Sequence, residues 1–270
     1  MISIDMFAIT DVGIKRAHNE DCVHITPSHG IAILADGMGG YNAGEVASAM
    51  AVDVINNSLR AKILDVPQAE IDKDTGFTHE SVLVRQAIKA SNEAIYNAAQ
   101  AQSEYAGMGT TVLVAAFYGN HITAAHVGDS RMYRLRDKTL THVTVDHSLV
   151  HEQVRRGLLT ADDARNSRIK NLVTRALGCD PRVEADLVED MVSAGDLYLM
   201  CSDGLTDVVS DEDINHCLGH CKKDLQKTAL QLVQMANNAG GPDNISIILI
   251  RASEASAKLK GGLFGRLFNR

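Results

Sequence analysis

Apolar residues recur along the chain with two different periods, which predict strands and helices in separate blocks. Short apolar runs that end in glycine, such as "IDMFAITDVG" (residues 4–13) and "GIAILADG" (30–37), are typical of β-strands. Residues 43–61 and 80–100 instead carry apolar side chains at helical spacing and predict two long amphipathic helices. The polar stretch between them, residues 62–79, predicts a surface connection.

A block rich in strands follows the second predicted helix. The runs "TTVLVAAFYG" (110–119) and "HITAAHVG" (121–128) predict a hairpin, because the Gly-Asn pair between them supplies the backbone freedom of a tight turn. The runs "RMYRLRD" (131–137) and "TLTHVT" (139–144) predict two more strands. Residues 147–170 are polar and helical or loop-like, which indicates an excursion from the core.

The C-terminal third repeats the mixture of strands and paired helices. The run "GDLYLMCSDG" (195–204) predicts a strand, residues 211–221 and 225–238 predict two helices, and "NISIILIRA" (244–252) predicts the last strand. Strands outnumber helices, and no regular alternation of strand and helix is present. The pattern therefore favours an α+β fold with antiparallel sheets and helices packed outside them.

Composition limits the class of protein. A chain of 270 residues with 45% hydrophobic residues can bury a full core, and one large domain is expected. The formal charge of −8 argues against a nucleic-acid surface. Five cysteines without framework spacing indicate a reducing compartment. The first residues lack the features of a signal peptide, and no run of about 18 apolar residues predicts a transmembrane segment. A cytoplasmic protein is therefore expected.

Acidic residues stand where predicted strands begin or end, each beside a small residue. The acids that share this placement are Glu20, Asp21, Asp36, Asp129, Asp203 and Asp243. A single aspartate at a strand end is usually a turn residue or a helix N-cap. Five such places in one chain favour a shared site, and the neighbouring glycines leave room for a ligand or ion to approach the backbone.

Converging carboxylates have a chemistry of their own. They repel one another and raise their own pKa values unless cations neutralise them. Oxygen ligands without histidine or cysteine select hard cations such as Mg²⁺ or Mn²⁺ over zinc. Two such ions about 3.5–4 Å apart can hold and deprotonate a water between them, and they can stabilise charge on a phosphoryl oxygen. The acids therefore predict a binuclear Mg²⁺ or Mn²⁺ centre.

Seven motifs in a fixed order carry a family resemblance. They are "TDVGIKRAHNED", "ADGMGGYNAGEVAS", "GMGTT", "AHVGDSR", "VDHSLV", "LMCSDGL" and "GGPDN". Together they resemble the motif series of the bacterial metal-dependent protein serine/threonine phosphatases of type 2C. The resemblance spans residues 10–250 and implies a four-layer sandwich, in which two central antiparallel β-sheets are flanked by pairs of α-helices.

The resemblance implies a set of metal ligands. Asp36 would bridge two ions, and the carbonyl of Gly37 would bind one of them. Asp203 and Asp243 would complete the shell of the other ion. Glu20 would act on the second ion, partly through water. Asp129 resembles the acid that, with Asp203, holds a weaker third ion in bacterial members.

The resemblance also implies three catalytic residues. Arg16 would clamp the substrate phosphate, for which a guanidinium fork is suited. Asp21 would orient metal-bound water, and Asn244 would hydrogen-bond near the metal-bound phosphate. Many eukaryotic members carry a histidine, a candidate general acid, where this chain has Met38, and a thioether cannot donate a proton. The leaving group would then be protonated by metal-bound water, another residue or solvent.

Other segments near the motifs have weaker interpretations. Residues 147–170 match the family's flap, which lies beside the cleft and affects substrate access. His18, His126 and His147 lie near the motifs, and a polar surface or supporting role is expected for them rather than direct chemistry. His216, Cys217, His220 and Cys221 have zinc-like spacing, but Gly219 weakens the helix and the segment lies away from the acids.

The expected activity is hydrolysis of phosphoserine and phosphothreonine monoesters in phosphorylated proteins, in opposition to a cognate serine/threonine kinase. The alternative is a catalytically silent phosphoprotein-binding module with the same fold, although such a module would typically be missing metal acids. A two-metal nuclease would need a basic track for a polyanion, which the acidic balance opposes. "GDSR" and "CSDG" lack the elbow motif of a serine nucleophile.

The sequence divides into a catalytic domain, residues 1–252, and a basic tail, residues 253–270. The tail holds four basic residues and one acid, with an apolar stripe formed by Leu263, Phe264, Leu267 and Phe268. Such a stripe could dock on a membrane surface or a partner protein. More often an end of this kind is a mobile tail.

Overall fold

The structure is a computed structural model. It describes residues 2–40, 43–160, 163, 167, 169, 172–220 and 224–255.

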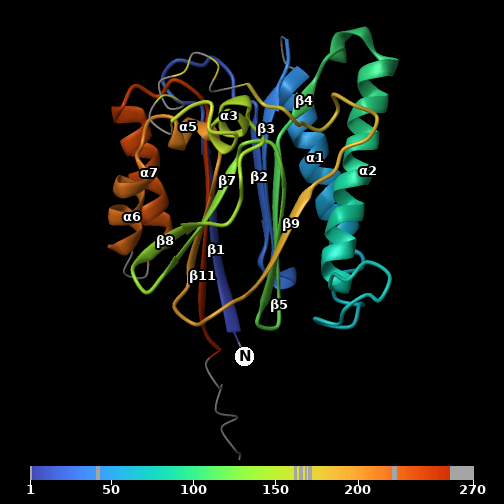
Figure 1. The fold of residues 1–270 in the computed structure, drawn as a ribbon, viewed down its shortest axis with the longest axis vertical. Helices are drawn as coiled ribbons and strands as arrows, with labels where there is room; N and C mark the ends of the chain where they lie inside the picture. The colour runs from blue at the N-terminus through green and yellow to red at the C-terminus, as the bar shows by residue number, and fades with distance from the viewer. Residues whose placement is uncertain are drawn as a thin grey trace, which may run out of the picture.

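Two antiparallel sheets form the centre of the molecule (Figure 1). The first has the strand order β1-β11-β10-β7-β8, and the second has the order β2-β3-β5-β6-β9, with β4 paired to β3. The strands are β1 (Ile2–Asp11), β2 (Asp21–Thr26), β3 (Ile31–Met38), β4 (Gly109–Thr110), β5 (Val112–Tyr118), β6 (His121–Val127), β7 (Arg131–Arg136), β8 (Thr139–His142), β9 (Asp186–Met191), β10 (Leu197–Cys201) and β11 (Ile245–Glu254).

Helices cover both outer faces of this sandwich (Figure 1). The α-helices of the described residues are α1 (Ala43–Arg60), α2 (His79–Ala101), α3 (Leu149–Arg155), α5 (Asp203–Thr206), α6 (Asp211–Gly219) and α7 (Leu225–Asn238), and the short 3₁₀ helices η1 (Pro27–His29) and η2 (Ser103–Tyr105) accompany them. In Figure 1, α1 and α2 lie beside the second sheet, whereas α6 and α7 lie beside the first. None of the helices in the described part of the chain is both long and apolar enough to span a bilayer.

Three apolar clusters hold the four layers together. One joins α1 and α2 to the second sheet, and Ile33, Ile55 and Ile88 are buried in it. Another joins α6 and α7 to the first sheet. The third lies between the two sheets and includes Leu113 and Tyr198. Because the chain has no tryptophan, these layers are filled mainly by Ala, Val, Ile, Leu and Met. The predicted α+β sandwich is confirmed.

Local patterns placed most elements correctly. The helices predicted at 43–61 and 80–100 are α1 and α2, and those predicted at 211–221 and 225–238 are α6 and α7. The predicted hairpin is formed by β5 and β6, and Gly119 in its turn has φ +56°. A positive φ of this kind is accessible to glycine without steric strain. Clear periodicity together with turn chemistry was therefore sufficient for these elements.

Two strands escaped prediction because of their amphipathic or polar composition. β2 has the sequence DCVHIT, in which polar and apolar residues are mixed, and β9 has the sequence DLVEDM with three acids. β9 lies at the end of the second sheet's strand path, next to β6. An edge strand can keep charged side chains in water while its backbone pairs with its neighbour. These two segments become strands through pairing partners that a local pattern does not contain.

The predicted flap and tail are only partly described. The predicted flap, residues 147–170, contains α3, which begins at Leu149, and its residues 161–162, 164–166, 168 and 170 lie outside the described residues. β11 continues to Glu254, so the predicted domain boundary at residue 252 falls inside the last strand. Of the predicted tail, residues 256–270, including the apolar stripe, lie outside the described residues.

Candidate metal centre

The acids predicted from strand ends meet at one end of the sandwich. β2 and β3 pair so that Asp21 stands opposite Asp36. Asp36 also lies within electrostatic range of Asp203, Asp129 and Asp243, which come from three other parts of the chain. Asp36 and four of the five other predicted acids are therefore close enough to interact electrostatically. Glu20, the sixth, is coupled electrostatically to Asp243.

Burial and like charge shift the titration of these acids. Burial raises the pKa of Asp36 well above its ordinary value, and the charges of Asp21 and Asp203 raise it further. Burial, followed by the charge of Asp129, raises the pKa of Asp203 well above its ordinary value as well. Burial raises the pKa of Asp21 to about 6 even though Ser246 and Ser202 donate hydrogen bonds to it. The protein thus holds a cluster of buried carboxyl groups that raise one another's pKa values.

Backbone contacts fix Asp36 in the floor of the site. Its N–H donates to Thr111 Oγ1 at 3.1 Å, and its carbonyl accepts from the N–H of Thr111 and the hydroxyl of Thr110, both at 2.8 Å. Gly37 follows, and a Cβ there would lie 2.1 Å from the carbonyl oxygen of Gly44 in the first turn of α1. Only glycine fits at this close approach of strand and helix, which explains the Asp-Gly pair.

Glu20 is held between β3, α1 and the loop that directly precedes β11. Its carbonyl accepts from the N–H of Gly37 at 3.1 Å, and its N–H donates to Asn244 Oδ1 at 2.9 Å. A Cβ on Gly44 would lie 2.7 Å from the Glu20 carboxylate, so the glycine leaves space for this side chain. Burial raises the pKa of Glu20, and the neighbouring Arg16 opposes that rise.

Asn244 has a different place from the one predicted. Both N–H bonds of its amide are engaged, because Nδ2 donates to the carbonyls of Val12 and His18, each at 2.9 Å. Its Oδ1 accepts from Glu20, and the residue is buried. A phosphate oxygen is a hydrogen-bond acceptor, and in this arrangement the amide has no N–H left to offer it. Asn244 therefore fixes the loop that carries Arg16 and Glu20 instead of facing the cleft.

Arg16 lies at the rim of the site. Its NH2 group forms an ion pair with Asp243 Oδ2 at 2.7 Å, and its side chain is 48% exposed. The loop that carries it rests on the segment before Asp243, because the N–H groups of Ile14 and Lys15 both donate to the carbonyl of Gly241. The guanidinium is thus placed beside the acids and remains open to solvent.

Asp203 and Asp129 complete the cluster from the sheet ends. Asp203 is the first residue of α5, and Ser202 alone separates it from the end of β10 at Cys201. Asp129 is 8% exposed in the turn between β6 and β7. Burial raises the pKa of Asp129 to about 6, and the charge of Asp146 adds to that rise.

The acids are spread more widely than the ligands of a single small ion. Within the part of the chain that the structure describes, three candidate ligand atoms that all lie within 4.8 Å of one another occur at His126, His147 and Asp186, and at no trio of the predicted acids. The ion pair to Arg16 holds one of these acids, Asp243. The arrangement therefore fits an extended site better than a single-ion cage.

The zinc-like histidine and cysteine motif does not form a comparable site among the described residues. Cys217 is 3% exposed and belongs to the apolar cluster under α6 and α7. His220 Nδ1 lies 2.7 Å from the carbonyl oxygen of His216, one turn earlier. Cys221 lies outside the described residues. The Cys217 thiol lies within the core, whereas His216 and His220 are exposed, so the thiol could not bind an ion held by these histidines.

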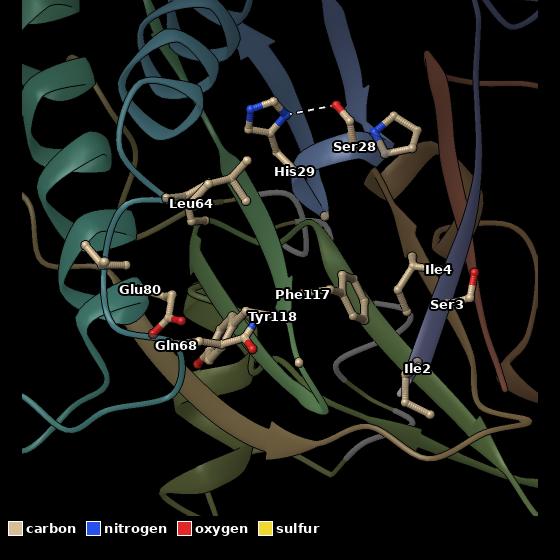
Figure 2. A pocket seen from close by; sticks show the side chains of 15 residues that line it. Ile2, Ser3, Ile4, Ser28, His29, Leu64, Gln68, Glu80, Phe117 and Tyr118 are labelled. Carbon is tan, nitrogen blue, oxygen red and sulfur yellow. Dashed lines mark hydrogen bonds between the residues drawn. The ribbon is translucent and has the colours of Figure 1, made fainter. Parts of the chain in front are cut away.

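A cavity of about 340 Å³ lies at the other end of the sandwich. Figure 2 shows Ile4, Leu64 and Phe117 among the side chains around it. Gly30, which also lines it, precedes β3, and Asp36 lies six residues further along that strand. At about 3.3 Å per residue the cavity and the acids are roughly 20 Å apart. None of the predicted site residues lines the cavity.

Gly204 tests how tightly the acid loops are packed. A Cβ at this position would lie 1.9 Å from the carbonyl oxygen of Asn244, next to Asp243. We expect Gly204→Ala to displace that loop, to lower the free energy of unfolding by about 1–3 kcal/mol, and to weaken metal-dependent activity. Gly219→Ala is the matched control, because its Cβ would meet nothing within 4 Å. Thermal unfolding and Mn²⁺ activation curves measure both effects, and equal behaviour of the two variants would contradict this packing.

Comparison with known proteins agrees with this geometry. The model of the family described as protein phosphatase 2C matches residues 14–240. The serine/threonine phosphatase stp of Listeria welshimeri is 37% identical over 244 residues, which cover 89% of this chain and 93% of that protein. The protein phosphatase PhpP of Streptococcus pneumoniae is 36% identical over 262 residues, which cover 94% of this chain and 100% of that protein.

Solved structures give the same result. The crystal structure of the Mycobacterium tuberculosis serine/threonine phosphatase PstP is similar with a TM-score of 0.82 and 35% identity, over 94% of this chain and 100% of that one. The catalytic domain of PstP in complex with two manganese ions has a TM-score of 0.81 and 34% identity over the same shares. The chain therefore belongs to the protein phosphatase 2C family. It is a metal-dependent protein serine/threonine phosphatase, and its substrates are phosphorylated proteins.

Proposed function

We propose that the chain hydrolyses phosphoserine and phosphothreonine monoesters at a binuclear Mg²⁺ or Mn²⁺ centre formed by the acids at the end of the sandwich. The observation that carries this proposal is the convergence of Asp36, Asp21, Asp203, Asp129 and Asp243, which come from distant parts of the sequence and share one electrostatic field. A protein gains no stability from buried carboxylates that repel one another, so their presence indicates a cationic ligand.

The donor set fits hard divalent cations. All the side-chain donors are carboxylates, which suit Mg²⁺ and Mn²⁺. One oxygen of Asp21, Oδ1, is buried and has no hydrogen-bond partner among the described residues. Buried polar atoms without a partner are rare, and an ion or an ion-bound water would satisfy this one. The glycines at 37 and 44 leave space beside Asp36 and Glu20.

The proposed ligands are assigned as follows. Asp36 would be shared by two ions, and the carbonyl of Gly37 would bind one of them. Asp203 and Asp243 would complete one shell, and Glu20 would serve the other, partly through water. When bound, such ions would supply a nucleophilic water at neutral pH and would neutralise charge on the phosphoryl group.

Two residues would prepare the site for substrate. Asp21, which accepts a hydrogen bond from Ser202 Oγ at 2.8 Å, is held in one orientation and would orient the attacking water. Arg16 would bind the phosphate through its guanidinium fork. Only its NH2 group pairs with Asp243 in this structure, and the side chain is half exposed, so other N–H groups of the guanidinium can reach a phosphate. Met38 has no proton to offer the leaving group, so another residue or solvent would have to supply it.

Asp129 adds to the cluster a proposed site for a third ion. The charge of Asp129 is the largest electrostatic contribution to the raised pKa of Asp203. We propose that these two acids hold a third, weaker ion, because Arg131 partly offsets the charge of Asp129. The physiological substrates are proposed to be products of a cognate serine/threonine kinase, by analogy with the family.

Metal dependence tests the proposed function. We expect protein stripped with a chelator to release no phosphate from a phosphothreonine peptide, and Mn²⁺ or Mg²⁺ to restore turnover. Phosphate release is followed over a range of metal concentrations, with circular dichroism to verify that the stripped protein stays folded. Binding energy from several carboxylates should also raise the Tm as metal is added.

The rival hypothesis gives a different result in the same experiment. A silent phosphoprotein-binding module would remain folded and bind metal, yet release no phosphate with either ion. Turnover that persists fully after chelation would contradict the metal centre itself. The two failures are thus separated by measuring metal binding and turnover on one sample.

A further inference from the structure

A short segment at the root of the flap is docked on the turn that carries Asp129. This flap root comprises residues 144–148. The N–H of His147 donates to the carbonyl of Gly128 at 3.0 Å. The N–H of Gly128 donates in return to Nδ1 of the His147 ring at 3.1 Å. His147 therefore binds both the backbone carbonyl and the backbone N–H of Gly128, the residue that directly precedes Asp129.

Neighbouring contacts hold the flap root in this place. His126 Nε2 lies 2.7 Å from the carbonyl oxygen of Val145. Arg131 binds the carboxylate of Asp146 with two groups, Nε at 3.0 Å and NH2 at 2.7 Å. On the far side of His147, its carbonyl accepts from the N–H of Thr174 at 2.7 Å. The histidine is therefore fixed by both its backbone and its neighbours.

The hydrogen bonds determine where the ring protons sit. Nδ1 of His147 accepts from Gly128, so the neutral ring carries its proton on Nε2, which lies 3.3 Å from Asp186 Oδ2. His126 Nε2 faces a carbonyl and must donate, so its Nδ1 carries the lone pair. The two buried rings are stacked with centroids 4.5 Å apart. Burial lowers the pKa of His126, and it lowers that of His147 to about 4, so both rings are neutral at neutral pH.

The same proton positions oppose a metal ion between these rings. The candidate ligand atoms of His126, His147 and Asp186 lie within 4.8 Å of one another, which suggests a small metal site. A metal on Nε2 of His147 would, however, force the proton onto Nδ1, where it would face the N–H of Gly128. Arg175 also binds Asp186 at 2.7 Å and would repel a second cation. The cluster is better suited to supporting its surroundings than to holding an ion.

We propose that His147 is a positioning residue, whose Nδ1 acceptor holds the Gly128–Asp129 turn so that the Asp129 carboxylate faces the other acids of the cleft. The inference rests on the proposed function, in which Asp129 takes part in cation binding. Because His147 is also the first residue of the flap, the same contact ties the flap to the metal site. Residues that orient a metal ligand from behind typically change metal affinity or activity about 10–100-fold when they are replaced.

Two substitutions of similar chemistry distinguish the role of Nδ1 of His147 from that of Nε2. In His147→Asn the amide oxygen occupies the position of Nδ1 and can still accept from Gly128. In His147→Gln the amide group reaches the position of Nε2 and leaves the N–H of Gly128 without its acceptor. Asp186→Asn is the control on the other side of the ring, because it removes the carboxylate near Nε2 and leaves the bond to Gly128 intact.

The test combines a metal titration with a measurement that does not require turnover. We expect His147→Gln to raise the Mn²⁺ concentration for half-maximal turnover about 10-fold or more, and His147→Asn and Asp186→Asn to stay within about 3-fold of the unchanged protein. Hydrogen exchange of the Gly128 amide should be faster in His147→Gln alone. Equal impairment of the Asn and Gln variants, or an unchanged Gln variant, would overturn the proposal.

Two further outcomes remain decisive. If His147→Gln does not fold, the Asn variant and Asp186→Asn still test the inference, since loss of Mn²⁺ response or of Gly128 protection in either would overturn it. If the unchanged protein shows no metal-dependent turnover, the proposed function fails. Exchange of the Gly128 amide then reports separately whether Nδ1 holds the turn.

Discussion

Asp36→Asn is expected to abolish metal-dependent hydrolysis and, at the same time, to make the metal-free protein more stable. Asp36 lies at the centre of the cluster, where burial and then the charges of four other predicted acids raise its pKa. The proposed role as a shared ligand of both ions leaves no second residue that can replace it. A metal ion supplies several kcal/mol of transition-state stabilisation, and about 4 kcal/mol corresponds to a loss on the order of 10³-fold in turnover.

The stability change has the opposite sign for a physical reason. The pKa of Asp36 is raised in the folded protein, so the folded state binds the proton more tightly than the unfolded state does. At neutral pH, where the carboxyl group is ionised in the unfolded chain, this difference destabilises the fold, and it diminishes as the pH falls through the raised pKa. Asparagine removes the charge, so its advantage is largest at neutral pH and disappears on acidification.

Thermal unfolding with and without metal checks this prediction. A gain on the order of 1–2 kcal/mol is expected for metal-free Asp36→Asn at neutral pH, or about 2–4 °C in Tm per kcal/mol for a chain of this length. Saturating Mn²⁺ should reverse the order, because only the unchanged site gains full binding energy. Asp65→Asn, at an exposed position outside the cluster, is the control and should change neither quantity. A variant that keeps its turnover, or a metal-free variant that is less stable, would contradict the interpretation.

Arg16→Ala is expected to have the second largest effect, mainly on substrate binding. The guanidinium lies 2.7 Å from Asp243 and is half exposed at the rim of the acids, where a phosphate monoester would arrive. Charge-assisted hydrogen bonds contribute about 1.5–3 kcal/mol each, so we expect kcat/KM to fall on the order of 10²-fold, with most of the loss in KM. Arg16→Lys keeps the charge but not the fork and should be intermediate.

Steady-state kinetics on a phosphothreonine peptide, together with inhibition by inorganic phosphate, measures this effect. Inorganic phosphate should inhibit the Ala variant more weakly than the unchanged protein, because inorganic phosphate and the phosphate group of the peptide would bind the same guanidinium. The metal titration of each variant is the control for the loss of the ion pair with Asp243. An unchanged KM and unchanged phosphate inhibition would show that Arg16 serves Asp243 and not the substrate.

Sequence alone determined the parts of this protein that short-range chemistry controls. Helical spacing located α1 and α2, and a Gly-Asn turn located the β5–β6 hairpin. The acids at strand ends were also visible, because an aspartate followed by glycine after an apolar run, as at Asp36, is a local pattern. The ordered motifs then identified the family, which the comparisons confirm.

Tertiary structure decided what depends on residues far apart in the chain. β2 and β9 are strands because of their pairing partners, since their own patterns are mixed or acidic. The amide of Asn244 binds the carbonyl of Val12, 232 residues away, and so faces the loop instead of a phosphate. His147 reaches the turn before Asp129 because the flap root folds back onto β6 and β7. A sequence records which groups are present, whereas hydrogen bonds between distant segments arise only when the fold brings the donors and acceptors together.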